Sequence, residues 1–173
     1  MSRSRRTLLA LPAVAGACLL APPVASADDA SLFATYNARQ PTDVAAAAAE
    51  YKRAWRTLRR SDGRRGVRGI LRANRRINDV TKVIEGELAA QVPSSDHGVK
   101  AQRAAIREVR GWHRANRYES RGWRRAMRGE SPRALMRRAG KEMYRAFKQG
   151  RRAVRHFKAV GLTSDLRGIT QTP

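Results

Sequence analysis

The sequence is short of several features, and each shortage excludes a class of protein. It has one cysteine, Cys18, so it is not a domain held together by disulfides. Val, Ile and Thr do not alternate with polar residues over a useful length, which argues against a β-sheet. P-loop, Gly-x-Ser-x-Gly and dinucleotide-binding fingerprints are absent, so no nucleotide-binding or serine-hydrolase motif is present.

Histidines are also few and isolated. The three, His97, His113 and His156, lie on separate predicted elements, with no His-x-x-x-His pair and no Glu-x-x-His pair among them. Metal sites in proteins need several ligands at such spacings. We therefore expect neither a metal ion nor another cofactor.

Acidic residues are scarce as well. The 173 residues include 14 Asp and Glu against 37 Lys and Arg, and the formal net charge is +23. This excess is too large for an ordinary metabolic enzyme and indicates a polyanionic partner. Apolar residues make up 42% of the chain, which is enough for one folded core and too many for a disordered tail.

The first 27 residues have the parts of an export signal. Basic residues within 3–6 precede an apolar stretch over 7–20, and 25–27 match a small-x-small cleavage site. We predict that 1–27 is a removable signal peptide of the Sec or twin-arginine type, and that the protein is secreted or associated with the cell envelope. Removal of three Arg leaves a charge of 23 − 3 = +20. In the alternative, Cys18 ends a lipoprotein box and carries a lipid anchor.

The rest of the chain has the periodicity of amphipathic helices. We predict an all-α fold, an antiparallel bundle of about four helices, of which the third and fourth are long. Residues 28–41 are predicted to form an N-terminal arm or short helix, 42–161 the bundle and 162–173 a flexible tail. The bundle helices are predicted over 42–60, 67–91, 99–128 and 132–160.

Two boundaries in this region carry specific signals. Ser131-Pro132 is typical of a helix start with Ser131 as the N-cap, and Gly161 is typical of a helix end. Only Gly129 and Glu130 separate the last two helices. These helices therefore form either a hairpin or one long bent helix.

Basic residues repeat at spacings of three and four along the last two predicted helices, which places them on one face of each helix. Few acids lie beside them, so the stripes repel themselves, and a bound polyanion would relieve the repulsion. The alternative is a solvated face without a ligand. The predicted polyanion-binding residues are Arg103, Arg107, Arg110, Arg114, Arg117, Arg121, Arg124 and Arg128, followed by Arg138, Lys141, Arg145, Lys148, Arg152 and Arg155.

Two tyrosines, Tyr118 and Tyr144, project near these stripes and not with the apolar residues. Aromatic rings among arginines can stack on the bases of single-stranded nucleic acid. The alternative is a tyrosine at the edge of the bundle with its hydroxyl in water.

Two acids, Glu108 and Glu119, fall on the apolar side of 99–128 with no Arg or Lys three or four residues away. We expect each to pair with a basic group across the bundle or to face water at its edge. With His113, they are the residues that an acid–base site would use if the protein were an enzyme. We assign no catalytic residue otherwise.

An internal repeat runs through the same region. Residues 111–120 and 122–131 agree at seven of ten positions. Eleven residues make about three helical turns, so both copies show the same face. The repeat is either a reused phosphate-gripping unit or a duplicated stable piece of helix.

Together these features predict an exported, non-enzymatic helical protein that binds a polyanion through arginine stripes. The candidate partners are an anionic cell-wall polymer, an anionic membrane surface and nucleic acid. The alternatives are a membrane-active, toxin-like bundle, a small secreted enzyme with an Arg-lined cleft, and a module that binds an acidic protein. The oligomeric state stays open.

Overall fold

The computed structural model describes residues 27–38, 44–60 and 63–162. Within these ranges the chain is helical and contains no strand. The prediction of an all-α fold is confirmed, with five helices in place of about four. They are α1 (Ala27–Ala38), α2 (Ala45–Arg60), α3 (Gly63–Ala90), α4 (Asp96–Met127) and α5 (Arg133–Ala159).

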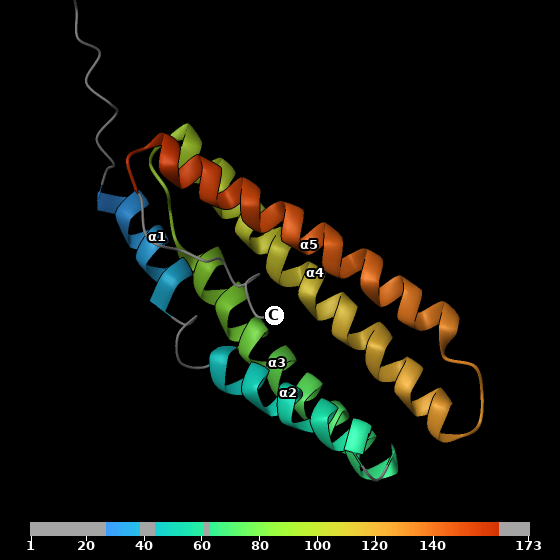
Figure 1. Ribbon diagram of the computed structural model, residues 1–173. Helices are drawn as coiled ribbons and strands as arrows, with labels where there is room; N and C mark the ends of the chain where they lie inside the picture. Colours follow the sequence, from blue (N-terminus) through green and yellow to red (C-terminus); the bar gives the residue numbers. More distant parts are fainter. Residues whose placement is uncertain (1–26, 39–43, 61–62, 163–173) are drawn as a thin grey trace, which may run out of the picture.

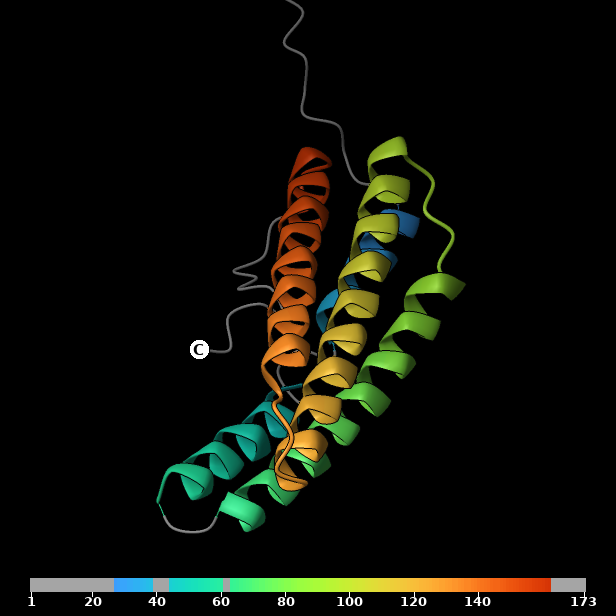
Figure 2. The same cartoon turned by 90° about the vertical axis from the view of Figure 1, so that its right-hand side faces the viewer.

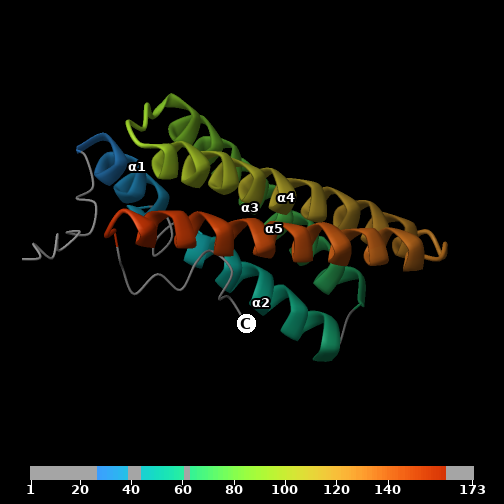
Figure 3. The same ribbon diagram turned by 90° about the horizontal axis from the view of Figure 1, so that it is seen from above.

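The helices α4 and α5 lie side by side along their whole length as an antiparallel hairpin (Figures 1 and 2). The helix α3 packs against α4 on its other side, and α2 packs on α3 (Figure 3). The short α1 contacts α3 and α4 near the start of α4. The first half of the chain therefore covers one side of the hairpin and leaves its opposite face open.

The chain reverses between α4 and α5, so the alternative of one bent helix is wrong. Gly129 has a φ of +78°, a conformation that glycine adopts without steric cost. Its N–H donates to the carbonyl of Ala126 at 3.0 Å, and the N–H of Glu130 donates to the carbonyl of Arg125 at 3.0 Å. These two bonds close α4 in the manner of a Schellman motif.

Other helix ends differ in part from the expectation. Ser131 does not cap α5, because Pro132 occupies the N-cap position and no side-chain cap bond forms. The cap that does form is at Ser95, whose Oγ accepts from the N–H of Gly98 at 2.9 Å, so α4 begins at Asp96, before the predicted start. The predicted end of α5 is confirmed, because Gly161 follows it with a φ of +78°.

The main apolar core joins α1, α3, α4 and α5. From α1, Leu32 and Tyr36 are buried, and the rings of Phe33 and Tyr36 lie 5.1 and 5.5 Å from the ring of Phe157. Burial of an aromatic side chain such as Phe157 contributes about 1.5–3 kcal/mol. The sequence predicts either an arm or a short helix in this part of the chain. The structure has a helix there, α1, and its side chains belong to the core.

A buried acid also ties α1 to the start of α4. Asp29 is fully buried, and its carboxylate accepts from the backbone N–H groups of Ser94 and Ser95 at 3.2 and 3.4 Å. The Oγ of Ser95 donates to the same carboxylate.

Residues 1–26 of the predicted signal peptide lie outside the described residues. Among the helices that are described, none combines the length and the apolar character needed to cross a membrane.

Candidate functional site

Every basic residue of the two predicted stripes is exposed in the structure. The stripes run along α4 and α5, which form the near face of the molecule in Figure 2. Small residues beside the stripes allow the two helices to pack closely. Gly111 of α4, for example, lies so close to α5 that an added Cβ would stand 2.8 Å from the Cβ of Ala146.

Acids pair with four of the fourteen stripe residues, so the expected self-repulsion of the stripes is reduced at these positions. Glu142 of α5 accepts from Arg114 Nε at 2.8 Å and from Arg145 at 2.6 Å. These two hydrogen bonds, the one from Arg114 foremost, hold the pKa of Glu142 below its usual value. Arg110 pairs with Glu85 of α3 at 2.6 Å. The physical reason is that α3 and α5 bring carboxylates to α4 that its own sequence lacks.

A groove lies between α4 and α5 at the end of the hairpin where α4 begins and α5 ends. Its basic residues are not neutralised by acids in this way. It has a volume of about 630 Å³, and its walls include no carboxylate among the described residues. None of its Arg or Lys side chains forms an ion pair with a carboxylate in the described part of the chain. The lining residues are His97, Lys100, Arg103, Ala104, Arg107, Gln149, Arg152, Arg155 and His156.

Two histidines from different helices meet in this groove. The Nδ1 atoms of His97 and His156 are 3.2 Å apart, a distance at which one ring donates a hydrogen bond to the other. Burial lowers the pKa of His156, and the nearby His97, Lys100 and Arg155 lower it further. A bound anion would oppose this effect, since it favours the charged form of the His156 ring.

The predicted stacking tyrosines lie outside the groove. Tyr118 is half-buried, and Tyr144 is 62% exposed on α5. The Nζ of Lys148 lies 5.8 Å from the centre of the Tyr144 ring, within the range of a cation–π contact. The structure therefore does not bring these rings together with the groove cations.

The predicted partners of Glu108 are wrong, because it lies in the core and meets no basic group. Tyr36 donates to its Oε2 at 2.7 Å, while Oε1 has no hydrogen-bond partner. Burial raises the pKa of Glu108 to about 7, against a smaller lowering from the Tyr36 hydrogen bond. Gly150 of α5 makes room for it, since an added Cβ would stand 2.5 Å from Oε1.

The same correction applies to Glu119, which has three neutral donors. It accepts from Tyr51 at 2.5 Å, from Asn74 at 3.0 Å and from Trp123 at 3.2 Å. Neutral donors satisfy a buried carboxylate without the desolvation of a second charge. The sequence carries a partial signal for this arrangement, because a Glu stands four residues before a Trp at 108 and 112 and again at 119 and 123, one repeat of eleven apart.

His113 lies on the side of α4 that faces α3. Burial lowers its pKa first, followed by the charges of Lys82 and Arg117. No contact joins it to Glu108 or Glu119 in the described residues, so the three do not assemble an acid–base site. Within those residues no group of three His, Cys, Asp or Glu side chains is placed to hold a metal ion.

Comparisons with known proteins add no relative. No protein-family model, no curated protein and no solved structure matches the chain.

Proposed function

We propose that the protein binds a phosphate-bearing polyanion, and that the groove between α4 and α5 is its primary contact. The observation that supports this proposal is the concentration of Lys100, Arg103, Arg107, Arg152 and Arg155 around one hollow with no carboxylate in its walls. Elsewhere on the hairpin, Glu85, Glu130 and Glu142 pair with Arg110, Arg114, Arg125, Arg128 and Arg145.

The groove suits a chain of anions better than a single small ion. Its cations come from two helices, so a linear polymer that follows the groove meets both rows. Each guanidinium can fork onto two oxygens of a phosphate, sulfate or carboxylate group. Since charges separated by more than about 8 Å are screened at physiological ionic strength, the close cluster counts for more than the net charge.

The exposed stripe beyond the groove extends the contact for a longer polymer. Residues such as Arg117, Arg121 and Arg124 are exposed and form no ion pair with a described carboxylate. The proposal includes export, so the polyanion is an anionic wall polymer, an anionic membrane surface or extracellular nucleic acid. Contact is mainly electrostatic, with little readout of sequence.

The test compares two variants of residues 28–173 that lose the same charge. One carries Arg103→Gln, Arg107→Gln, Arg152→Gln and Arg155→Gln in the groove. The matched control carries four exposed changes on α2 and α3, namely Arg60→Gln, Arg68→Gln, Arg72→Gln and Arg75→Gln.

Binding of duplex DNA, heparin and a teichoic-type polymer is measured over a salt gradient. For DNA binding, we expect the magnitude of the slope of log K against log salt to be about 3–4 smaller in the groove variant, since each phosphate contact accounts for about 0.9. The control variant should lose much less. Equal losses in the two variants would show that net charge alone attracts the polymer, and free passage of the unmodified chain through heparin at physiological salt would refute binding.

A further inference from the structure

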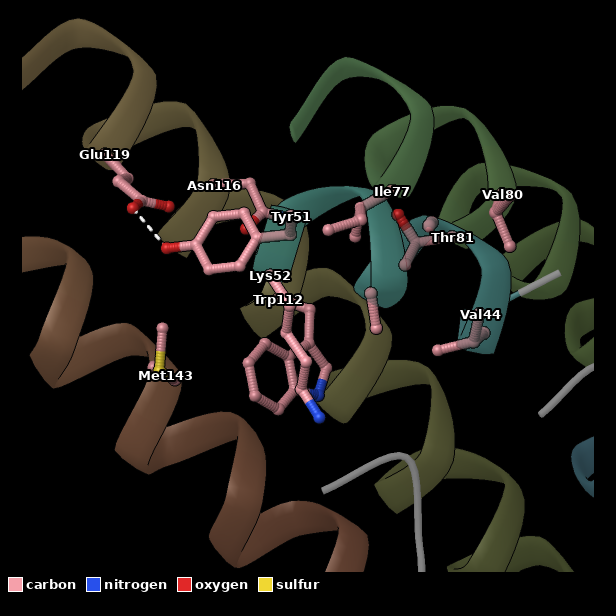
Figure 4. A pocket seen from close by; sticks show the side chains of 12 residues that line it. Val44, Tyr51, Lys52, Ile77, Val80, Thr81, Trp112, Asn116, Glu119 and Met143 are labelled. Carbon is pink, nitrogen blue, oxygen red and sulfur yellow. Dashed lines mark hydrogen bonds between the residues drawn. The ribbon is translucent and has the colours of Figure 1, made fainter. Parts of the chain in front are cut away.

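A second cavity, separate from the basic groove, lies between α2, α3 and α4, with Met143 of α5 at its edge (Figure 4). Its volume is about 320 Å³, at the lower end of the range for small-molecule sites. That volume has room for about ten water-sized groups. Its wall on α2 runs from Val44 to Lys52, which is about 12 Å along the helix axis. The cavity is therefore suited to an extended chain.

The lining is mainly apolar, and several of its polar groups are occupied, although the buried Nε1 of Trp112 has no hydrogen-bond partner among the described residues. Val44, Ile77 and Val80 are among the apolar side chains that face the cavity (Figure 4), and Ala48 also lines it. The Thr81 hydroxyl donates to the carbonyl of Asn78 at 3.0 Å. The carboxylate of Glu119 receives the three hydrogen bonds described above, one of them drawn in Figure 4. A ligand in this cavity gains apolar burial and meets few open polar partners.

A basic surface hollow adjoins this cavity. Tyr51 and Lys52 line both, and the surface hollow adds Trp55, Arg56 and Arg59. Lys52, Arg56 and Arg59 follow the spacing of four and three that places them on one face of α2. All three are exposed and form no ion pair with a carboxylate in the described residues. No acid lines the surface hollow.

We propose that this site binds a single-chain anionic amphiphile. The acyl chain occupies the cavity, and the anionic head group lies against Lys52, Arg56 and Arg59. An apolar cavity beside an unpaired cationic patch is complementary to such a molecule in both shape and charge. A cationic or uncharged head group finds no partner at this mouth. Free fatty acids and monoacyl phospholipids share the required chemistry.

Trp112 lines the cavity and Trp55 lines the adjoining hollow, so tryptophan fluorescence is expected to change when the site is occupied. The ligands for a titration of residues 28–173 are dodecanoate, lauroyl lysophosphatidylglycerol, dodecanol and dodecyltrimethylammonium, all below their micelle concentrations. We expect saturable binding of the two anions, and the stronger of them identifies the source of the chain. Decanoate should bind about 16-fold more weakly than dodecanoate, because each buried methylene is worth about a factor of four.

Two substitutions at α2 form a matched pair. Ala48→Phe fills the cavity, whereas Ala45→Phe adds the same ring at an exposed position of the same helix. We expect the first to weaken dodecanoate binding at least tenfold and the second to leave it unchanged. A separate variant with Lys52→Gln, Arg56→Gln and Arg59→Gln should weaken dodecanoate and leave dodecanol unaffected. This variant alters exposed side chains only, so it stays decisive if Ala48→Phe loses helix content.

Three results would overturn the proposal: equal affinity for dodecanoate and dodecyltrimethylammonium, no dependence on chain length, or full binding by a folded Ala48→Phe variant. The polyanion groove lies on α4 and α5 and is untouched by these changes. Failure of one proposal is therefore distinguishable from failure of the other.

Discussion

The buried carboxyl of Glu108 predicts an unusual pH dependence of stability. Its Oε2 is held by the Tyr36 hydroxyl and its Oε1 has no partner, inside the apolar core that joins α1 to the hairpin. The informative perturbation is Glu108→Gln, which resembles the protonated carboxyl in shape and removes its titration. A comparison of the two chains over pH isolates this one group.

The magnitude follows from the displacement of the pKa. Burial raises the pKa of Glu108 from 4.5 to about 7. The unfolded chain therefore releases this proton near pH 4.5, while the folded protein holds it until about pH 7. Folding stability falls as pH rises through this window and then levels off. At about 1.36 kcal/mol per pKa unit, the fall amounts to about 3 kcal/mol.

The assay is urea unfolding of residues 28–173, monitored by circular dichroism at several pH values between 4 and 8. We expect the stability difference between Glu108→Gln and the unmodified chain to change by about 3 kcal/mol in favour of the variant between pH 4.5 and pH 7.5. Tyr36→Phe should raise the pKa of Glu108 further, since it removes the hydrogen bond that favours the carboxylate.

The matched control is Glu142→Gln. The pKa of Glu142 is lowered by Arg114 and Arg145, so the contribution of Glu142 to folding stability is lost only as pH falls below about 4.5. Its stability curve should run parallel to that of the unmodified chain above pH 5. If the Glu108→Gln curve is also parallel to that of the unmodified chain across pH 4.5–7.5, burial does not raise the pKa of the Glu108 carboxyl.

Three further outcomes can be measured. Gly150→Ala places a methyl group against the Glu108 carboxylate and should lower the unfolding free energy by about 1–3 kcal/mol in the same urea assay. Phe157→Ala removes the ring that contacts α1 and should cost about 3–5 kcal/mol, with thermal unfolding as a second measure. Affinity for heparin should rise as pH falls from 7.5 to 5.5, because the bound polyanion favours charged His156, and His156→Gln should reduce this rise while leaving affinity at pH 7.5 nearly intact.

Periodicity predicts much of this structure, because it fixes which residues of a helix share a face. The apolar and basic faces of α4 and α5 could be read from spacings of three and four. Periodicity does not show which helix covers a face, and the errors arise there. Tyr36, the partner of Glu108, stands 72 residues away, and Tyr51, one of the three donors to Glu119, stands 68 residues away, each on a helix that the pattern cannot place. The groove has the same origin, since its residues become neighbours only when the chain reverses at Gly129.

The distribution of the few acids defines the basic groove more sharply than the total charge does. Of the 14 acidic residues, Glu108 and Glu119 lie in the interior with neutral donors, where they offer nothing to the surface arginines. Glu142 stands between Arg114 and Arg145 and neutralises the middle of the hairpin. Glu130 binds Arg125 and Arg128 at its turn. None of these carboxylates lines the groove at the end where α4 begins and α5 ends, which is why we propose that end as the first contact for a polyanion.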